Sequence, residues 1–261
     1  MRLRLLLGVG LALVIAVAVV SAADLDGKAI VEKMAKQNES QSAETTAKMI
    51  LIDKNGRERV REIKMRTKEK NGLRHTVTTF LAPPDVRGTK FLIVEQKNAD
   101  DDQRLFLPAL KKVKRITSSN KSGNFMGSTF AYADLQTHDP DQGAHQRLAD
   151  AVLDGQDCYV VETVPQNLDD EIYSKLVYWV RKDNFLPIKG EFYDKKGKLW
   201  KRLEVSGVEK RSDGTWVAKD TKMSDLLKGA STILRLEEYE VDVEIDDAYF
   251  TERFLTDETL E

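Results

Sequence analysis

The chain has 261 residues and is nearly balanced in charge, with 41 Lys and Arg against 43 Asp and Glu. Its net charge of −2 at pH 7, without a long basic tail, argues against nucleic acid as a partner. Cys158 is the single cysteine, so no internal disulfide can form and packing must hold the fold together.

The first residues have the features of a secretory signal peptide. Arg2 and Arg4 precede an uncharged run over residues 5–20, and three small residues follow at 21–23. We therefore expect export to the periplasm and cleavage near Ala23/Asp24. A retained membrane anchor is the alternative, because the apolar run is only slightly shorter than a spanning helix.

After this leader, residues 24–261 are predicted to form a single domain that opens with a short helix. Apolar residues fall at helical spacing over residues 27–38, and Asp26 can cap the first turn. From residue 47 the apolar period changes to two, and turn signals such as Asn55-Gly56 separate the segments. The expected strands cover residues 47–51, 63–67, 73–81, 90–96, 103–107, 156–163, 171–181, 188–193, 199–208, 215–226 and 230–245.

These strands are predicted to pair antiparallel. The loops between them are mostly short, and about ten or eleven parallel strands would need crossover helices that the sequence lacks. Several strands, such as 91–94 and 176–180, are apolar on both faces. Either helices and loops cover the second face, or a strongly curved sheet encloses an apolar cavity. With one clear helix available, the sequence favours a mainly β fold around a cavity.

Residues 111–153 are the exception, because they are rich in Ser, Asn, Gly and Asp and show no sustained period. Long connections of this kind are lids or binding loops, with disorder as the alternative. The apolar Phe125, Met126, Phe130 and Tyr132 argue against disorder, since leaving each in water would cost about 1.5–3 kcal/mol.

No polar cluster in the sequence has the spacing of a catalytic or metal site. His138 and His145 flank residues 139–141, but the spacing fits no standard zinc pattern. Residues 100–102 are three aspartates without the ligand pattern of an EF-hand, and Cys158 lies in an apolar strand as a small core residue. We predict no catalytic residue, metal or cofactor. A hydrolase whose carboxylates meet only in the fold remains an alternative.

Charged residues gather in separate parts of the chain. Basic residues are frequent over 57–70 and 111–115, and acidic residues dominate 237–247. They form either the solvated outer faces of strands or a polarised surface that meets anionic headgroups or a charged partner.

Three blocks together resemble the outer-membrane lipoprotein-sorting family, a LolA-like group. They are FLAPPDVRGTKFL at 80–92, LFLPALKKVKRI at 105–116 and GNFMGSTFAYADL at 123–135. The resemblance implies an unclosed antiparallel β-barrel with helices across its mouth, whose apolar interior accepts acyl chains. It also implies a periplasmic carrier of lipid or lipoprotein toward the outer membrane, with an inner-membrane transporter of the resistance-nodulation-division (RND) type as partner. A sensor or scaffold on the same fold is the alternative.

The carrier hypothesis makes specific residues candidates for lipid binding. We expect a monomer whose cavity is lined by inward strand residues and covered by a mobile loop. An ordinary filled core is the alternative, and a one-residue shift in register would turn a strand's side chains to the other face. The candidate lining residues are Phe80, Phe91, Ile93, Phe106, Val177 and Trp179, and the candidate loop residues are Phe125, Met126 and Phe130.

The signal-peptide prediction can be tested directly. Protein released with the periplasmic contents of an expressing cell should begin near Asp24 in N-terminal sequencing, because the small residues at 21–23 form the cleavage site. An uncleaved product embedded in the membrane would contradict this prediction.

Overall fold

The computed structural model describes residues 25–37, 40–97, 99–136, 139–168, 171–212 and 214–257. The predicted signal peptide lies outside these residues. The strands are β1 (Ser42–Ile52), β2 (Glu58–Lys70), β3 (Leu73–Ala82), β4 (Lys90–Val94), β5 (Asp102–Leu107), β6 (Lys112–Ile116), β7 (Gly143–Arg147), β8 (Ala151–Leu153), β9 (Gln156–Pro165), β10 (Lys175–Arg181), β11 (Pro187–Tyr193), β12 (Leu199–Lys210), β13 (Trp216–Asp225) and β14 (Ala230–Val241). Short 3-10 turns are η1 (Pro108–Leu110), η2 (Ser118–Asn120), η3 (Phe125–Gly127), η4 (Ala133–Leu135), η5 (Pro140–Gln142) and η6 (Asp247–Phe250).

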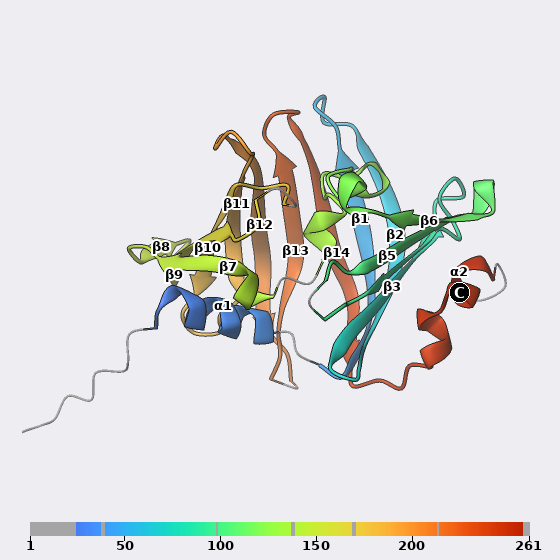
Figure 1. The fold of residues 1–261 in the computed structure, drawn as a ribbon, viewed down its shortest axis with the longest axis horizontal. Helices are drawn as coiled ribbons and strands as arrows, with labels where there is room; N and C mark the ends of the chain where they lie inside the picture. The colour runs from blue at the N-terminus through green and yellow to red at the C-terminus, as the bar shows by residue number, and fades with distance from the viewer. Residues whose placement is uncertain are drawn as a thin grey trace, which may run out of the picture.

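All of these strands belong to one antiparallel sheet, as the sequence predicted. Its order is β6-β5-β4-β3-β2-β1-β14-β13-β12-β11-β10-β9-β7, with β8 also paired to β9. Among the described residues β6 and β7 are the two ends of this order and do not pair with each other, so the barrel is unclosed. The sheet curves around a concave face, which looks toward the viewer in Figure 1.

Local sequence explains the tight turns that let neighbouring strands pair. Between β2 and β3, Asn71 and Gly72 have φ of 55° and 75°. Two successive residues with positive φ make the type of hairpin turn whose twist matches the flanking strands, and Asn-Gly is the pair that adopts it most readily. The middle of the sheet is apolar on both faces, since Met49, Ile50 and Leu51 of β1 are all buried.

The helix α1 (Gly27–Lys36) begins where the sequence predicted. The Asp26 side chain accepts a hydrogen bond from the amide of Ala29 at 2.8 Å and caps the first turn. The helix packs through Ile30 and Val31 against Val161 and Val180, on the concave face at the β9–β10 end of the sheet. A side chain at Gly27 would not fit, because its Cβ would lie 2.7 Å from the carbonyl oxygen of His145 in β7.

The outer face of β3 to β5 is covered by the C-terminal segment, which the sequence did not predict. Here η6 and α2 (Glu252–Thr256) bring Phe250, Phe254 and Leu255 against Val77 and Leu92. The buried Lys90 attaches this segment, since its Nζ donates to the carbonyl oxygens of Phe254 at 3.0 Å and Asp257 at 2.5 Å. These ammonium–carbonyl bonds act at the C-terminal end of α2, where the helix dipole favours a cation.

The strand count is higher than the ten or eleven predicted, because residues 111–153 contain β6, β7 and β8. These strands are too short for their alternation to stand out, and β6 is an edge strand rich in lysine, as edge strands often are. The predicted strand at 230–245 ends earlier, at Val241. Among the described residues, none of the helices is both long and apolar enough to cross a membrane.

Packing of the C-terminal segment makes a testable contribution to stability. Phe254→Ala should lower the free energy of unfolding by about 3–5 kcal/mol, because it leaves a cavity between α2 and the sheet. Urea denaturation followed by tryptophan fluorescence measures this change. The matched control is Leu110→Ala, since Leu110 is 62% exposed and its loss should cost less than about 0.5 kcal/mol. Equal effects of the two substitutions would contradict the assigned packing.

Candidate functional site

The concave face of the sheet carries two apolar clusters that meet at β14. In one half, β1 to β5 contribute inward side chains such as Met49, Ile63 and Leu105. In the other half, Phe192 and Met223 lie in a second cluster. Leu234 of β14 packs against both clusters and so joins the two halves.

A single segment lies across this surface. Residues 121–135, here named the plug segment, contain η3 and η4 and appear in light green in front of the sheet in Figure 1. The segment folds back on itself, because the amide of Phe125 donates to the carbonyl of Phe130 at 2.7 Å and Asn124 forms a β-bridge with Ala131. Its tip is a reversal at Met126 and Gly127, which have φ of 47° and 73°.

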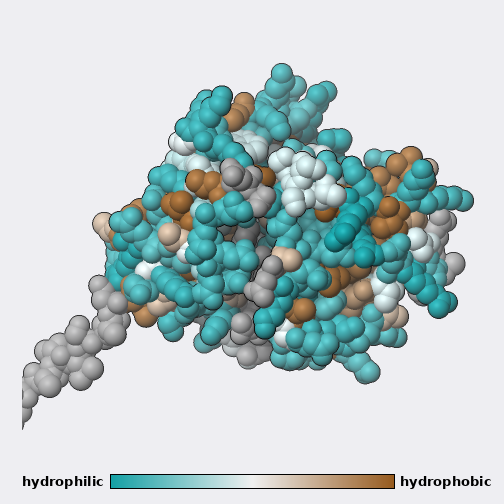
Figure 2. All heavy atoms as spheres, viewed as in Figure 1, coloured by the Kyte–Doolittle hydropathy of each residue, from teal (hydrophilic) through white to brown (hydrophobic). Residues whose placement is uncertain are grey.

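Two phenylalanines of the plug segment fill the concave face. Phe125 packs into the first cluster, with ring centroids 5.0 Å from Phe91 and 5.9 Å from Phe80. Phe130 packs into the second cluster against Phe192 and its neighbours. In the space-filling view, hydrophilic side chains cover most of this side of the molecule, and apolar ones form small separate groups (Figure 2). The plug segment therefore closes the apolar surface.

A few hydrogen bonds attach the plug segment to the sheet. The amide of Thr129 donates to the hydroxyl of Thr232 at 3.0 Å, and the Thr129 hydroxyl donates to the carbonyl of Met223 at 2.7 Å. The amide nitrogen of the Gln103 side chain donates to the carbonyl of Tyr132 at 3.0 Å. These bonds satisfy polar groups that would otherwise be buried without partners.

Arg61 of β2 holds the tip of the plug segment. Its guanidinium donates to the carbonyl of Met126 and lies over the ring of Phe80, 5.8 Å from the centroid. The residue is only 9% exposed. Burial lowers the pKa of Arg61, the positive charge of Arg59 lowers it further, and Asp85 opposes both effects. The Met126 carbonyl thus accepts a hydrogen bond from a guanidinium whose charged form is disfavoured by burial.

At its other end the plug segment is held by a buried ion pair. The Asp134 carboxylate lies 2.9 Å from Nζ of Lys201 in β12, and their side chains are 4% and 3% exposed. The hydroxyl of Tyr173 donates to the other carboxylate oxygen at 2.6 Å. Burial raises the pKa of Tyr173, and the negative charge of Asp134 raises it further, so this phenol stays a donor. Both carboxylate oxygens are therefore bound by groups outside the plug segment, Lys201 of β12 and Tyr173 of the connection that leads into β10.

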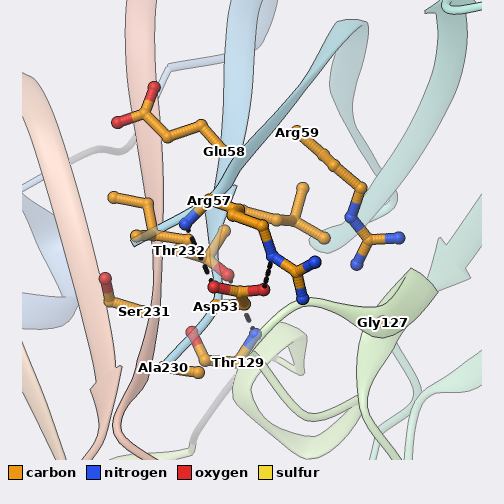
Figure 3. Close-up of a pocket in the computed structure, with 11 residues that line it drawn as sticks. Asp53, Arg57, Glu58, Arg59, Gly127, Thr129, Ala230, Ser231 and Thr232 are labelled. Carbon is orange, nitrogen blue, oxygen red and sulfur yellow. Dashed lines mark hydrogen bonds and ion pairs between the residues drawn. The ribbon is translucent and has the colours of Figure 1, made fainter. Parts of the chain in front are cut away.

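A pocket of about 550 Å³ lies beside the tip, between the β1–β2 hairpin, β14 and the plug segment. Leu51, which belongs to the first apolar cluster, also lines the pocket and connects it to the concave face. Arg57 is paired with Asp53 at 2.7 Å on its rim, and Arg59 extends toward the side where Gly127 lies (Figure 3). The pocket is an opening at the edge of the closed apolar surface.

The structure places the predicted lipid-binding residues on both faces. Phe80, Phe91 and Ile93 lie on the concave face, Phe125 and Phe130 insert into it, and Met126 packs partly buried at the tip.

Three predicted lining residues point the other way. Phe106 packs under the C-terminal segment on the outer face. Val177 and Trp179 alternate with Leu176 and Tyr178, which lie in the concave cluster, so they face outward. The cause is register, because one position along a strand reverses the side-chain direction and these strands are apolar on both faces.

The polar residues of the site were missed by sequence reasoning. Arg61, Asp134, Tyr173 and Lys201 come from separate elements and meet only in the folded protein. The sequence held one indication of the buried charge. Lys201 lies two positions before Leu203 in β12, so the two side chains point to the same face of the sheet.

Other charged residues singled out in the sequence have structural partners. On the outer face of β2, Lys64 and Arg66 pair with Glu44, and Lys68 and Lys70 pair with Asp247. These pairs support the interpretation of Lys64, Arg66, Lys68 and Lys70 as an outer strand face, whereas Arg61 of the same basic stretch contacts the plug segment.

The residues around 139–141, which the sequence left without a metal pattern, are likewise bonded within the protein. The ring nitrogens of His145 lie 2.7 Å from the carbonyl of Pro140 and 2.9 Å from the hydroxyl of Thr163. His138 lies outside the described residues. In the part of the chain that the structure describes, no three His, Cys, Asp or Glu side chains form a group that could hold a metal. Cys158 is buried, which confirms its prediction as a core residue.

Comparison with known proteins agrees with this architecture. An outer membrane lipoprotein-sorting protein domain from Vibrio parahaemolyticus is 35% identical, with a TM-score of 0.83 over 88% of this chain and 98% of its own. A DUF1329 family protein from Desulfovibrio piger is 32% identical, with a TM-score of 0.83 over 88% of this chain and 97% of its own. A LolA superfamily protein from Nitrosomonas europaea is 21% identical, with a TM-score of 0.70 over 88% and 100% of the two chains, a likeness of fold.

A family model described as an uncharacterized protein matches residues 72–257. No curated protein matches the sequence. The unclosed antiparallel sheet with few helices is a LolA-like fold. The chain belongs to the outer-membrane lipoprotein-sorting protein family.

The buried ion pair leads to a stability prediction. Lys201→Met should lower the free energy of unfolding by about 3–5 kcal/mol, because it leaves the Asp134 carboxylate buried without its cation. The double variant Asp134→Asn/Lys201→Met should recover much of this loss, which urea denaturation measures as a coupling energy. Lys228→Met is the control. The Lys228 side chain is 59% exposed, so its ion pair with Asp225 should contribute less than about 1 kcal/mol to the free energy of unfolding. If the effect of the double variant equals the sum of the effects of Asp134→Asn and Lys201→Met alone, Asp134 and Lys201 are not coupled.

Proposed function

We propose that the protein is a periplasmic carrier that holds the acyl chains of a lipid or lipoprotein on its concave face after the plug segment moves away. One observation carries the proposal. Among the described residues, the apolar surface where the two clusters meet is covered mainly by residues 121–135, with Tyr173 beside Phe130, and not by a second sheet or a layer of long helices. A cover of this kind can leave while the sheet stays intact.

The energies of opening and of binding are comparable. Exposing Phe125 and Phe130 would cost about 1.5–3 kcal/mol each, and the lost hydrogen bonds would add about 1 kcal/mol each. A buried acyl chain gains about 0.8 kcal/mol per CH₂, so roughly a dozen methylenes yield about 10 kcal/mol. A long chain can therefore offset the exposure of the two phenylalanines, whereas a short one cannot, and the contacts of Asp134 with Lys201 and Tyr173 must be replaced as well.

The pocket beside the tip supplies a place where the exchange can begin. It reaches Leu51 of the first cluster, and Gly127 at the tip of the plug segment lines it. A chain end that enters there meets apolar surface at once, and each further methylene can displace part of Phe125. The hydrogen bond from Arg61 to the Met126 carbonyl opposes this movement and keeps the site closed without cargo.

The remaining parts of the proposal follow from the carrier role. Transfer by shielding and release needs no catalytic residue, so we propose no enzymatic activity. The name of the relative from Vibrio parahaemolyticus supports a role in lipoprotein sorting toward the outer membrane. An inner-membrane transporter of the RND type is the proposed partner, and it rests on the sequence resemblance alone.

The proposal predicts that loosening the plug segment improves lipid binding. Phe125→Ala removes the side chain that fills the first cluster, so it should tighten the binding of a fluorescent fatty acid by about tenfold or more through a shift toward the open state. Leu105→Ala is the matched control, because it removes apolar area from the same cluster but on the sheet. It should lower thermal stability without tightening binding.

The titrations are run beside thermal melts of the same variants. If the two substitutions change binding alike, residues 121–135 are not the moving cover. If the wild-type protein binds no long-chain amphiphile, the carrier function is wrong.

A further inference from the structure

The Asp134 carboxylate, at the base of the plug segment, is bound in the way that a protein binds an anionic ligand. Lys201 of β12 and Tyr173 of the connection that leads into β10 hold the two oxygens of the Asp134 carboxylate at 2.9 Å and 2.6 Å. The backbone amide of Ala131, within the plug segment itself, adds a bond of 2.7 Å to one of these oxygens. Asp134 and Ala131 belong to the plug segment and Lys201 and Tyr173 do not, so in the proposed opening the first two would leave and the last two would stay.

The surroundings of Lys201 make its charge costly without an anion. The residue is 3% exposed, so its ammonium has lost most of its hydration. The rings of Trp200 and Tyr173, with centroids 4.8 Å and 5.6 Å from Nζ, offset only a part of that loss. Asp225 lies opposite Lys201 on β13, but its carboxylate accepts hydrogen bonds from the amides of Leu227 and Lys228 at 3.1 Å and 3.0 Å. Removing one partner of a buried ion pair is strongly destabilising because the other charge remains uncompensated.

We propose that Lys201 and Tyr173 form a binding site for the anionic headgroup of the cargo, and that Asp134 occupies this site in the closed protein. The inference rests on the proposed carrier function and specifies its substrate class, an amphiphile that bears a carboxylate or a phosphate. The ammonium of Lys201 pairs with one headgroup oxygen and the phenol of Tyr173 donates to another. A neutral lipid would leave Lys201 uncompensated, so the site selects against it.

The position of the site fits an amphiphile. Tyr173 belongs to the second apolar cluster together with Phe192 and Met223, and Leu234 continues the apolar surface to the first cluster. A headgroup at Lys201 therefore leaves its chain on the surface that Phe130 and Phe125 now cover. The polar and apolar parts of the cargo would each replace a part of the plug segment with the same chemistry.

Three probes with the same chain test this inference: dodecanoate, dodecyl phosphate and the neutral 1-dodecylglycerol. Their affinities are measured by displacement of a fluorescent lipid from the full mature protein. The wild type should prefer an anionic probe over the neutral one by about tenfold to a hundredfold, the range of a hydrogen-bonded charge. The stronger of the two anionic probes identifies whether a carboxylate or a phosphate is recognised.

Two variants separate the headgroup site from the apolar surface. Asp134→Asn removes the internal anion and keeps its shape, so it should tighten the binding of the anionic probes more than that of the neutral probe. Asp134→Asn/Lys201→Met removes both charges and should bind all three probes with similar affinity, while still binding the neutral probe at least as tightly as the wild type. Melting curves confirm that each variant is folded at the temperature of the assay.

The outcomes distinguish this inference from the function on which it rests. Equal wild-type affinities for neutral and anionic probes, or a preference that persists in the double variant, would overturn the anion site and leave the carrier function standing. Wild-type protein that binds none of the probes would overturn the carrier function and the anion site together.

Discussion

The apolar concave face of an unclosed sheet is the constraint on which the rest of the structure depends. A sheet of this width with apolar side chains on both faces must bury each of them, because exposed area costs about 25 cal/mol per Å². A closed barrel buries its inner face because the strands enclose it completely. Here the ends of the sheet stay apart, so other segments of the chain cover what the sheet leaves open.

The two faces are covered in different ways, and the difference bears on function. The outer face carries the C-terminal segment, whose phenylalanines pack over Val77 and Leu92 and whose carbonyls bind the buried Lys90. The concave face carries the plug segment, which is bound by two buried cations of the sheet, Arg61 and Lys201. Because separating a buried ion pair leaves a charge without its partner, the plug segment stays in place unless an incoming group takes over the contact that Asp134 makes with Lys201.

Sequence reasoning reached the antiparallel β fold and the capped first helix, and it singled out Phe125 and Phe130, which pack on the concave face. These features are local or periodic, so they can be read without knowing which strands are neighbours. The same reasoning assigned Phe106, Val177 and Trp179 to the cavity, although they face outward. Strands that are apolar on both faces have no alternation that marks the inward side, so the sequence alone could not exclude an error of one position in assigning their side chains.

The sequence by itself determined the fold class, the turns at Asn-Gly pairs and the presence of large apolar residues in an otherwise polar excursion, because each follows from neighbouring residues. Only the tertiary structure decided that the excursion fills the concave face and that Asp134 meets Lys201 and Tyr173. The physical reason is that these contacts join residues far apart along the chain. A charge at an inward strand position is tolerated only when a distant segment supplies its partner, and no local pattern encodes that partner.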